Sequence, residues 1–180
     1  LERLDPLKEF LDDLVRCIND EGEIRNNATP ELKQAIRNTE IAKSKLEERL
    51  QRLFKSESIR EALQDSYITE REERMVIPVR AEFKSRVDGI VHDSSGTGQT
   101  LFIEPSSIVP LNNQLKIARL QVVQEKIRIL QALAMQTLQS REILETNFET
   151  LISLDLIYAK ARLAKTMAAI HCPMNGDSIM

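Results

Sequence analysis

One short stretch gathers most of the residues that could do chemistry: residues 91–105, VHDSSGTGQTLFIEP, with a histidine, an aspartate, two serines and a Gly-x-Gly. A phosphate-binding loop of the Walker type needs a lysine after its glycines and a helix behind them. Here Gln99 occupies the position of that lysine, and Thr100-Leu101-Phe102-Ile103 is typical of a strand. The stretch therefore does not predict a nucleotide-binding loop.

The same stretch does not predict a hydrolase site either. A catalytic triad needs a base and a nucleophile that meet in space and a third group that orients the base. His92, Asp93 and Ser94 are consecutive on an extended chain, so their side chains point alternately to opposite faces. We interpret the three residues as the end of a strand that runs into a turn.

Two further clusters are better explained without a bound ligand. His171 and Cys172 have no second Cys/His pair at metal-ligand spacing, and a histidine at the end of a helix complements the helix dipole. Cys17 is distant from Cys172 in sequence, which favours reduced thiols in the cytoplasm. The acidic run at residues 70–74 could coordinate a cation, but a solvated turn before a strand explains it better.

Arg80, Lys84 and Arg86 are the residues that point to a partner. They lie on or just after a predicted strand, next to the serine and glycine turn of residues 94–99. Such a turn, with hydroxyls and free amides beside cations, can contact phosphates without reading bases. The alternative is that the three cations only solubilise the surface. Because the net charge is −3, any attraction to a polyanion must be local.

Helical patterns dominate the first part of the chain. Apolar residues recur at helical spacing over residues 4–18, and a second helix opens at Thr29-Pro30-Glu31 with a cap, a first-turn proline and an early acid. Apolar positions from Leu32 to Leu53 follow a heptad, which favours packing within the chain over a dimeric coiled coil. A short helix from Glu57 to about Gln64 is also predicted.

The hydrophobic period then changes to two. Residues 75–83 alternate as a half-buried strand, and Pro78, which cannot donate to a ladder, predicts a sheet edge. Residues 87–93 and 99–104 are two more predicted strands, joined by Ser-Gly-Thr-Gly, which suits a hairpin. Together the three strands predict an antiparallel meander that ends at Pro105.

After Asn112, a predicted cap, the helical pattern returns without proline or glycine as far as residue 172. Two apolar stripes follow this helix, so it is expected to contact two neighbours. One stripe contains Leu115, Val122 and Ile129, and the other contains Leu120, Val123, Ile127, Leu130 and Ala134.

The predicted fold class is α+β and mainly α, with long lever helices and a small inserted antiparallel β-sheet. Its predicted parts are a helical segment, 1–74, a sheet, 75–111, and returning helices, 112–180. The composition, 42% hydrophobic and 29% charged, fits a soluble fold with a core. No apolar run approaches the roughly 20 residues of a membrane span, so no membrane partner is predicted. The chain lacks a starting methionine, and we expect it to be a piece of a longer protein.

Several motifs together resemble the middle region of the bacterial MutS-two proteins, a MutS-related family. The most specific is the block from Ser95-Gly96 to Glu104-Pro105, and the resemblance spans most of the chain. In the turn before the first strand, Glu72-Glu73-Arg74-Met75 replace a glycine and an aromatic residue of the family pattern. The other matching motifs are Val76-Ile77-Pro78-Val79-Arg80-Ala81-Glu82-Phe83, Gly89-Ile90-Val91-His92-Asp93-Ser94, Leu111-Asn112-Asn113, Ala28-Thr29-Pro30-Glu31-Leu32 and Ala159-Lys160-Ala161-Arg162.

The resemblance implies a MutS core and lever region with a small β clamp inserted between long helices. It implies that the clamp tip contacts the DNA backbone without base specificity, in a protein that acts on branched or mismatched DNA and suppresses homologous recombination. The contact residues implied by this analogy are Arg80, Lys84, Arg86, His92, Ser94, Ser95, Gly96, Thr97, Gly98 and Gln99.

The resemblance also implies functions that belong to other parts of such a protein. The family carries an ATPase domain that binds ATP and Mg²⁺, and often a nuclease-type domain. We therefore expect this fragment to have no catalytic residue, cofactor or metal of its own. The full-length proteins are implied to act as cytoplasmic homodimers, and some engage stalled ribosomes. A structural or dimerisation arm, or an arm that engages stalled ribosomes, is the alternative to a DNA clamp.

Overall fold

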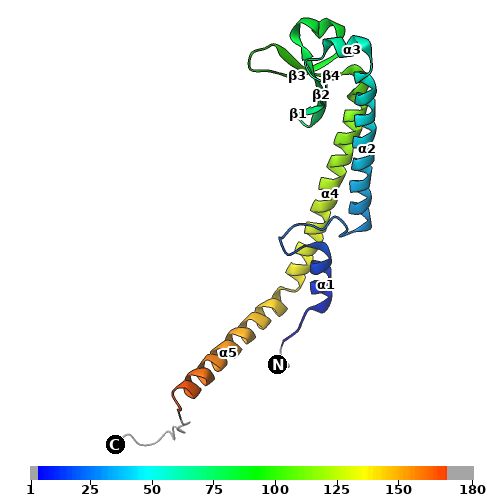
Figure 1. Ribbon diagram of the computed structural model, residues 1–180. Coiled ribbons are helices and arrows are strands. Elements are labelled where there is room, and N and C mark those ends of the chain that lie inside the picture. The colour runs from blue at the N-terminus through cyan, green and yellow to red at the C-terminus, as the bar shows by residue number, and fades with distance from the viewer. Residues whose placement is uncertain (1–3, 170–180) are drawn as a thin grey trace, which may run out of the picture. The chain divides into compact units, whose positions relative to one another are not determined.

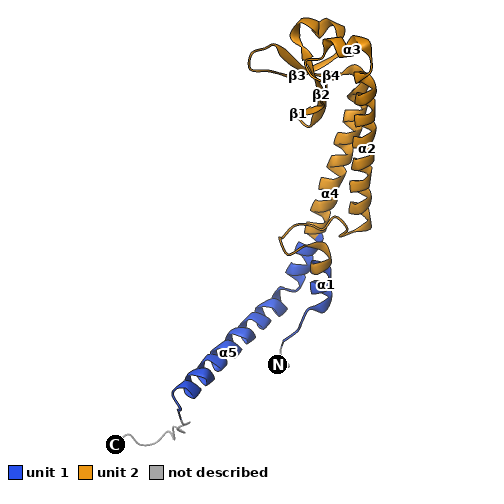
Figure 2. Cartoon of the chain, viewed as in Figure 1, with its two compact units in different colours: residues 1–14, 132–180 blue, residues 15–131 orange. Residues whose placement is uncertain are grey.

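The structure, a computed structural model, describes residues 4–169 and forms two compact units (Figure 2). Unit 2 runs from Val15 to Gln131, and unit 1 contains the described residues up to Leu14 and those from Ala132 onward. Mainly helical elements with one small antiparallel sheet confirm the predicted fold class. Every predicted contact residue belongs to unit 2.

Two helices of unit 2 begin where the sequence predicted. Helix α2 (Pro30–Phe54) has Thr29 as its cap, and the Thr29 Oγ1 accepts a hydrogen bond of 3.1 Å from the Leu32 amide. Proline at the first helical position needs no amide partner there, so it is tolerated. The short helix α3 (Glu57–Ala62) follows at once, also as predicted.

The core of unit 2 lies where α2 and the first part of α4 (Val109–Gln139) meet the sheet (Figure 1). Leu46 and Leu50 of α2 are fully buried in one cluster with Leu115 of α4. These heptad positions of α2 therefore pack within the chain, as predicted. The sheet and its flanks complete the cluster with Ala62, Leu63, Met75, Ile77, Val79, Val87, Ile103 and Ile108.

The sheet has four antiparallel strands in the order β1-β2-β4-β3. They are β1 (Thr69–Arg71), β2 (Arg74–Arg80), β3 (Gly89–Ser94) and β4 (Thr100–Pro105). The predicted meander is wrong because β4, and not β3, pairs with β2. A 3₁₀ helix leads the chain away from β2, so that β3 pairs on the far side of β4. The short β1 was not predicted.

Strand β2 is buried on both faces and is shorter than predicted. Its residues from Met75 to Val79 are all buried, and the chain turns into the 3₁₀ helix Ala81–Arg86 where the strand was expected to continue. The sequence MVIPV is apolar at every position, which is typical of a strand covered on both sides. The predicted half-buried alternation is therefore wrong for this strand.

Pro78 lies inside the sheet and not on an edge strand, because β2 has β1 on one side and β4 on the other. However, β1 pairs only as far as Val76. The Pro78 carbonyl accepts a hydrogen bond of 2.9 Å from the Gln64 amide. In a strand, the N–H and C=O of one residue point to the same side, so the missing N–H costs no bond to β4.

The hairpin from β3 to β4 depends on a close approach of two backbones. Gly89 pairs with Pro105, and a Cβ built on Gly89 would lie 2.3 Å from the Glu104 carbonyl oxygen. A bulge between Val91 and Asp93 bends β3 further along. Only glycine fits at position 89 without displacing the backbone of β4.

Replacing Gly89 by alanine should lower the free energy of unfolding by about 1–3 kcal/mol, because the added methyl group overpacks the β3–β4 contact. The midpoint of urea unfolding, followed by circular dichroism, measures this change. Gly96→Ala is the matched control, since a Cβ there has no heavy atom within 4 Å. Equal stability of the two variants would contradict the close approach.

Unit 1 contains most of α1 (Lys8–Cys17) and the whole of α5 (Arg141–Thr166). Asp5 and Asn147 hold it together with two reciprocal hydrogen bonds: the Asp5 amide donates to Asn147 Oδ1 at 3.0 Å, and Asn147 Nδ2 donates to the Asp5 carbonyl at 2.7 Å. Among residues 4–169, no helix is both long and apolar enough for a membrane span. His171 and Cys172 lie outside the described residues.

Candidate nucleic-acid interface

The fold brings Arg80 next to the hairpin turn, although the two are separated in sequence. The Ala81 amide donates to the Gln99 carbonyl at 2.9 Å, which fastens the end of β2 to the turn. A hollow of about 390 Å³ opens between them. Its lining comes from both segments and from the loop after α3: Gln64, Arg80, Ala81, Glu82, Thr97, Gly98 and Gln99.

Arg80 and Arg86 are both held by residues of their own unit. Arg80 Nη2 donates to the Glu61 carbonyl, and Arg86 Nη1 lies 3.0 Å from a carboxylate oxygen of Glu61. The two guanidinium groups also stack on the Phe83 ring, at 4.7 Å and 4.8 Å from its centroid. This arrangement orders the two cations but partly neutralises them, since Glu82 also lies 3.8 Å from Arg80.

Lys84 is the predicted cation that keeps its charge open to solvent. It is exposed on the 3₁₀ helix, between the two arginines, and its amine has no ion-pair partner within residues 4–169. An exposed lysine of this kind can approach an incoming phosphate without breaking an internal contact. Among the three predicted cations, Lys84 is therefore the best suited to contact a polyanion.

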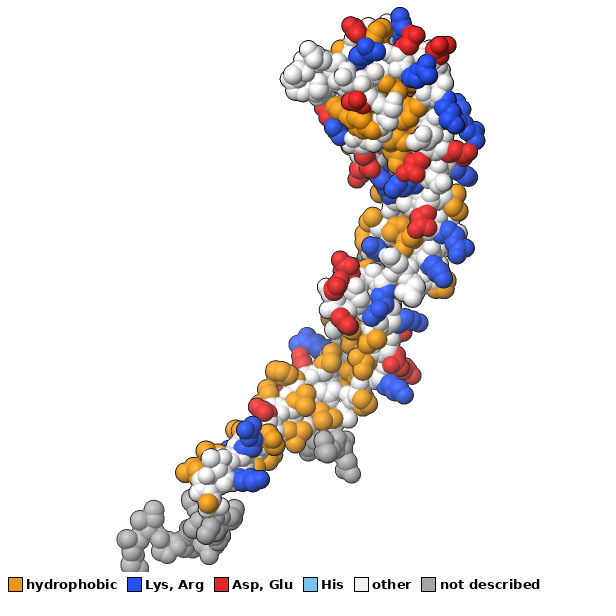
Figure 3. Space-filling model, in the orientation of Figure 1, with side chains coloured by type: hydrophobic (Ala, Val, Ile, Leu, Met, Phe, Trp, Pro, Cys, Tyr) orange, Lys and Arg blue, Asp and Glu red, His pale blue; other side chains and the backbone are white. Residues whose placement is uncertain are grey.

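The turn itself is polar and uncharged, as its white surface in Figure 3 indicates. Ser95 organises it: the Ser95 carbonyl accepts from the Gly98 amide at 2.7 Å, and the Ser95 Oγ accepts from the Thr100 amide at 3.1 Å. Gly98 has a φ of 71°, which favours glycine. Ser94 and the residues from Gly96 to Gln99 are exposed beside the cations, although the amides of Gly98 and Ser94 already donate within the hairpin, to the Ser95 carbonyl and to Asp93 Oδ1.

His92 points away from this turn and into the sheet. Its side chain is only 11% exposed, and Nε2 lies 2.7 Å from a carboxylate oxygen of Glu104. The other ring nitrogen lies 3.7 Å from the Glu72 carboxylate. The main contacts of the ring are thus internal. Contact of nucleic acid with His92, or with any other predicted residue, stays a prediction.

Glu104 is the centre of a buried polar network that the sequence analysis missed. Its side chain is fully buried, and one carboxylate oxygen accepts from Arg74 Nη1 at 2.7 Å and from Asn112 Nδ2 at 2.8 Å. The other oxygen contacts His92. One acidic residue within the apolar run Leu101 to Pro105 was the available signal, because a buried charge must be paired.

Asn112 joins the first turn of α4 to β2 and is not the predicted cap, since α4 begins earlier at Val109. Its Oδ1 accepts from the Met75 amide at 3.0 Å, and its Nδ2 donates to the Met75 carbonyl at 3.0 Å. Pairing between β2 and β4 begins only at Ile77. The Asn112 side chain therefore takes the place of a neighbouring strand.

Replacing Asn112 by alanine should lower the free energy of unfolding by about 2–4 kcal/mol, because two buried backbone groups of Met75 lose their partners. Thermal or urea unfolding measures the loss. The matched control is Asn113→Ala, which removes only an exposed acceptor for Arg74. An Asn112→Ala protein as stable as this control would contradict the role of the side chain.

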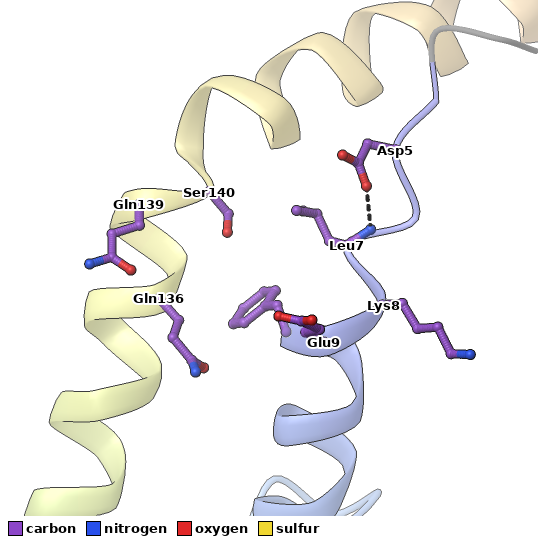
Figure 4. Close-up of a pocket in the computed structure, with 8 residues that line it drawn as sticks. Asp5, Leu7, Lys8, Glu9, Gln136, Gln139 and Ser140 are labelled. Carbon is purple, nitrogen blue, oxygen red and sulfur yellow. Dashed lines mark hydrogen bonds between the residues drawn. The ribbon is translucent and has the colours of Figure 1, made fainter.

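A second hollow, of about 380 Å³, belongs to unit 1 (Figure 4). The Asp5 carboxylate, which accepts from the Leu7 amide at 2.9 Å, lies on one side of it. Gln136 and Gln139 of α4, and Ser140 between α4 and α5, lie on the other. No predicted contact residue lines it. Within the described part of the chain, no three His, Cys, Asp or Glu side chains are grouped to hold a metal ion.

Curated relatives match almost the whole chain. An endonuclease MutS2 of Bacillus velezensis is 39% identical over 179 residues, which are 99% of this chain and 23% of the relative. The endonuclease MutS2 of Brevibacillus brevis is 40% identical over 176 residues, 98% of this chain and 22% of the relative. A putative endonuclease MutS2 of Bacillus subtilis is 39% identical over 174 residues, again 22% of that protein. No family model matches the chain.

The chain thus spans less than a quarter of the length of these relatives. The matched residues cover 97–99% of the chain, so the matches include both the helices and the sheet. It agrees with the resemblance carried by the Ser-Gly to Glu-Pro block. Over its matched length, this chain is homologous to one region of the MutS2 proteins.

Proposed function

We propose that this chain is a non-catalytic lever and clamp segment that contacts the backbone of DNA through its β3–β4 hairpin turn. The main support is that the polar turn meets Arg80 around one hollow, while Lys84 and Arg86 lie on the 3₁₀ helix that follows Arg80. Exposed turn amides and hydroxyls beside cations suit phosphate oxygens and carry no base specificity. Homology to the MutS2 proteins adds to this support.

We further propose a wider context for this contact. The longer protein would act on branched or mismatched DNA and suppress homologous recombination, with ATP, Mg²⁺ and any nuclease activity in other domains. The segment described here would bind the DNA backbone at the end of its long helices and would catalyse no reaction. Because Arg80 and Arg86 are already bonded to Glu61, the binding to DNA would be weak and would involve few phosphates.

The salt dependence of DNA binding tests the proposal. For duplex DNA, the slope of log K against log salt concentration changes by about 0.9 for each phosphate contact. Lys84→Ala should therefore flatten the slope by about 0.9, measured by fluorescence anisotropy with a labelled duplex. The triple change of Arg80, Lys84 and Arg86 to alanine should flatten it at least as much.

Lys45→Ala is the matched control, because Lys45 is an exposed cation on α2 that belongs to the same unit but not to the hairpin. Its slope should equal that of the unchanged chain. A slope that neither Lys84→Ala nor the triple variant alters would rule out this patch as a DNA contact.

A second candidate function is a structural or dimerisation arm, which one feature of α4 favours. Four residues of its second apolar stripe are not covered within unit 2: Leu120, Val123, Ile127 and Leu130 are each 48–51% exposed. Exposed apolar residues at heptad spacing are typical of a helix that packs against another helix.

Sedimentation velocity of the chain at increasing concentration tests this second candidate. Self-association through the stripe should be lost in Ile127→Glu, because a charge in the seam opposes packing. Ile41→Glu, at an exposed apolar position of α2, is the control that should leave association unchanged. A chain that stays monomeric at every concentration would exclude this function for the stripe.

A further inference from the structure

The hairpin of β1 and β2 is the most weakly supported part of the sheet. Strand β1 has three residues and pairs only with residues 74–76 of β2. Of the residues next to it, only Ile68 packs against the core. Short polar hairpins with few apolar contacts open at lower free energy than the core that carries them.

The turn of this hairpin is also strained. Glu72 and Glu73 have φ values of 50° and 62°, in the left-handed region that favours glycine or asparagine. A two-residue hairpin turn of type I′ needs positive φ at both central residues, which is why Asn-Gly is preferred there. Two glutamates adopt this backbone only if other contacts offset its cost.

Those contacts are mainly charge pairs, two of them to α4. Arg119 donates to both carboxylate oxygens of Glu70, at 2.7 Å and 3.2 Å, and to the Glu73 carbonyl at 3.3 Å. Lys116 lies 3.6 Å from the Glu73 carboxylate. A third pair joins Arg71 of β1 to Asp93 of β3 at 2.9 Å. All of these side chains are 33–69% exposed, so salt can screen the pairs.

We propose that residues 69–73 form an ionic latch, closed on α4 by Glu70 and Glu73, that keeps Arg119 and Lys116 from an approaching polyanion until the charge pairs are broken. Opening would release β1 and its turn while β2 stays paired with β4. The freed cations would lie on the second and third turns of α4 and add to the phosphate contact. This last step rests on the proposed function, whereas the latch itself does not.

Acid should open the latch as salt does. The hydrogen bond from Arg119 lowers the pKa of Glu70, and the nearby Lys43 acts in the same direction. A carboxylate whose pKa is lowered in the folded state stabilises that state above its unfolded pKa, and the contribution is lost as the pH falls through the folded value. Arg119 and Lys43 are thus the charged groups that act on Glu70, whereas Lys116 pairs with the neighbouring Glu73.

Amide hydrogen exchange measures the latch directly. The amides of residues 69–71 should exchange faster than those of Phe102 and Ile103 in β4, and the gap should widen as NaCl rises from about 0.05 M to about 1 M. Glu70→Gln should speed the β1 amides by about two- to fivefold at low salt, the range of an exposed charge pair. Glu72→Gly should slow them at every salt concentration, because it relieves the turn and keeps the pairs to α4.

The binding half of the proposal has its own measurement. If Arg119 is freed in Glu70→Gln, the slope of log K against log salt for duplex DNA should steepen by about 0.9 relative to the unchanged chain. An unchanged slope alongside faster β1 exchange would overturn the masking of the cations and leave the hairpin turn as the DNA contact. Exchange of β1 that responds to neither salt nor Glu70→Gln would overturn the latch.

Discussion

The arrangement of the sheet depends on the hydrogen bonds that the buried carboxylate of Glu104 makes. Its partners come from three other elements: Arg74 from β2, His92 from β3 and Asn112 from α4. A buried charge without partners is costly, so the network is satisfied only when all four elements meet in one geometry. Asn112 extends that constraint to the backbone of Met75. The sheet is thereby fixed to the start of α4 by polar contacts as well as by apolar packing.

This anchoring separates two kinds of residue around the sheet. Residues that point inward, such as His92 and Glu104, hold the strands in position. The residues available to a partner lie on the outer turn and on the 3₁₀ helix, with Lys84 as the cation that has no internal pair within the described residues. The β1–β2 hairpin belongs to neither kind. Its turn is strained, and exposed charge pairs offset the cost of that strain. Rigid and adjustable parts are thus neighbours in one small sheet.

The sequence predicted the features that depend on local chemistry. Thr29 and Pro30 mark the start of α2 because a cap and a first-turn proline act within one turn of helix. The hairpin turn at Ser95 to Gly98 was predicted for a similar reason, since Gly98 supplies the positive φ. The two-residue period also located most of the strands.

Features that depend on distant contacts were not predictable in this way. The position of Pro78 inside the sheet depends on Gln64, which supplies the donor that its carbonyl needs. The strand order depends on the 3₁₀ helix after β2, which local alternation at residues 81–83 concealed. The candidate site was predicted as a set of residues, but the internal pairing of Arg80 and Arg86 with Glu61 required the fold.

The pairing of α2 with α4 has a consequence for how such a protein can change during evolution. Pro30 and Glu31, at the start of α2, line the same hollow as Gln121 and Glu125 of α4. The start of α2 therefore lies beside Gln121 and Glu125 of α4. The chain runs along α2 to the sheet and returns along α4 to a neighbouring point. Equal numbers of helical turns could be added to or removed from both helices without moving these two points. The distance between the sheet and the start of α2 is thus open to variation, while the packing at either end of the helix pair is retained.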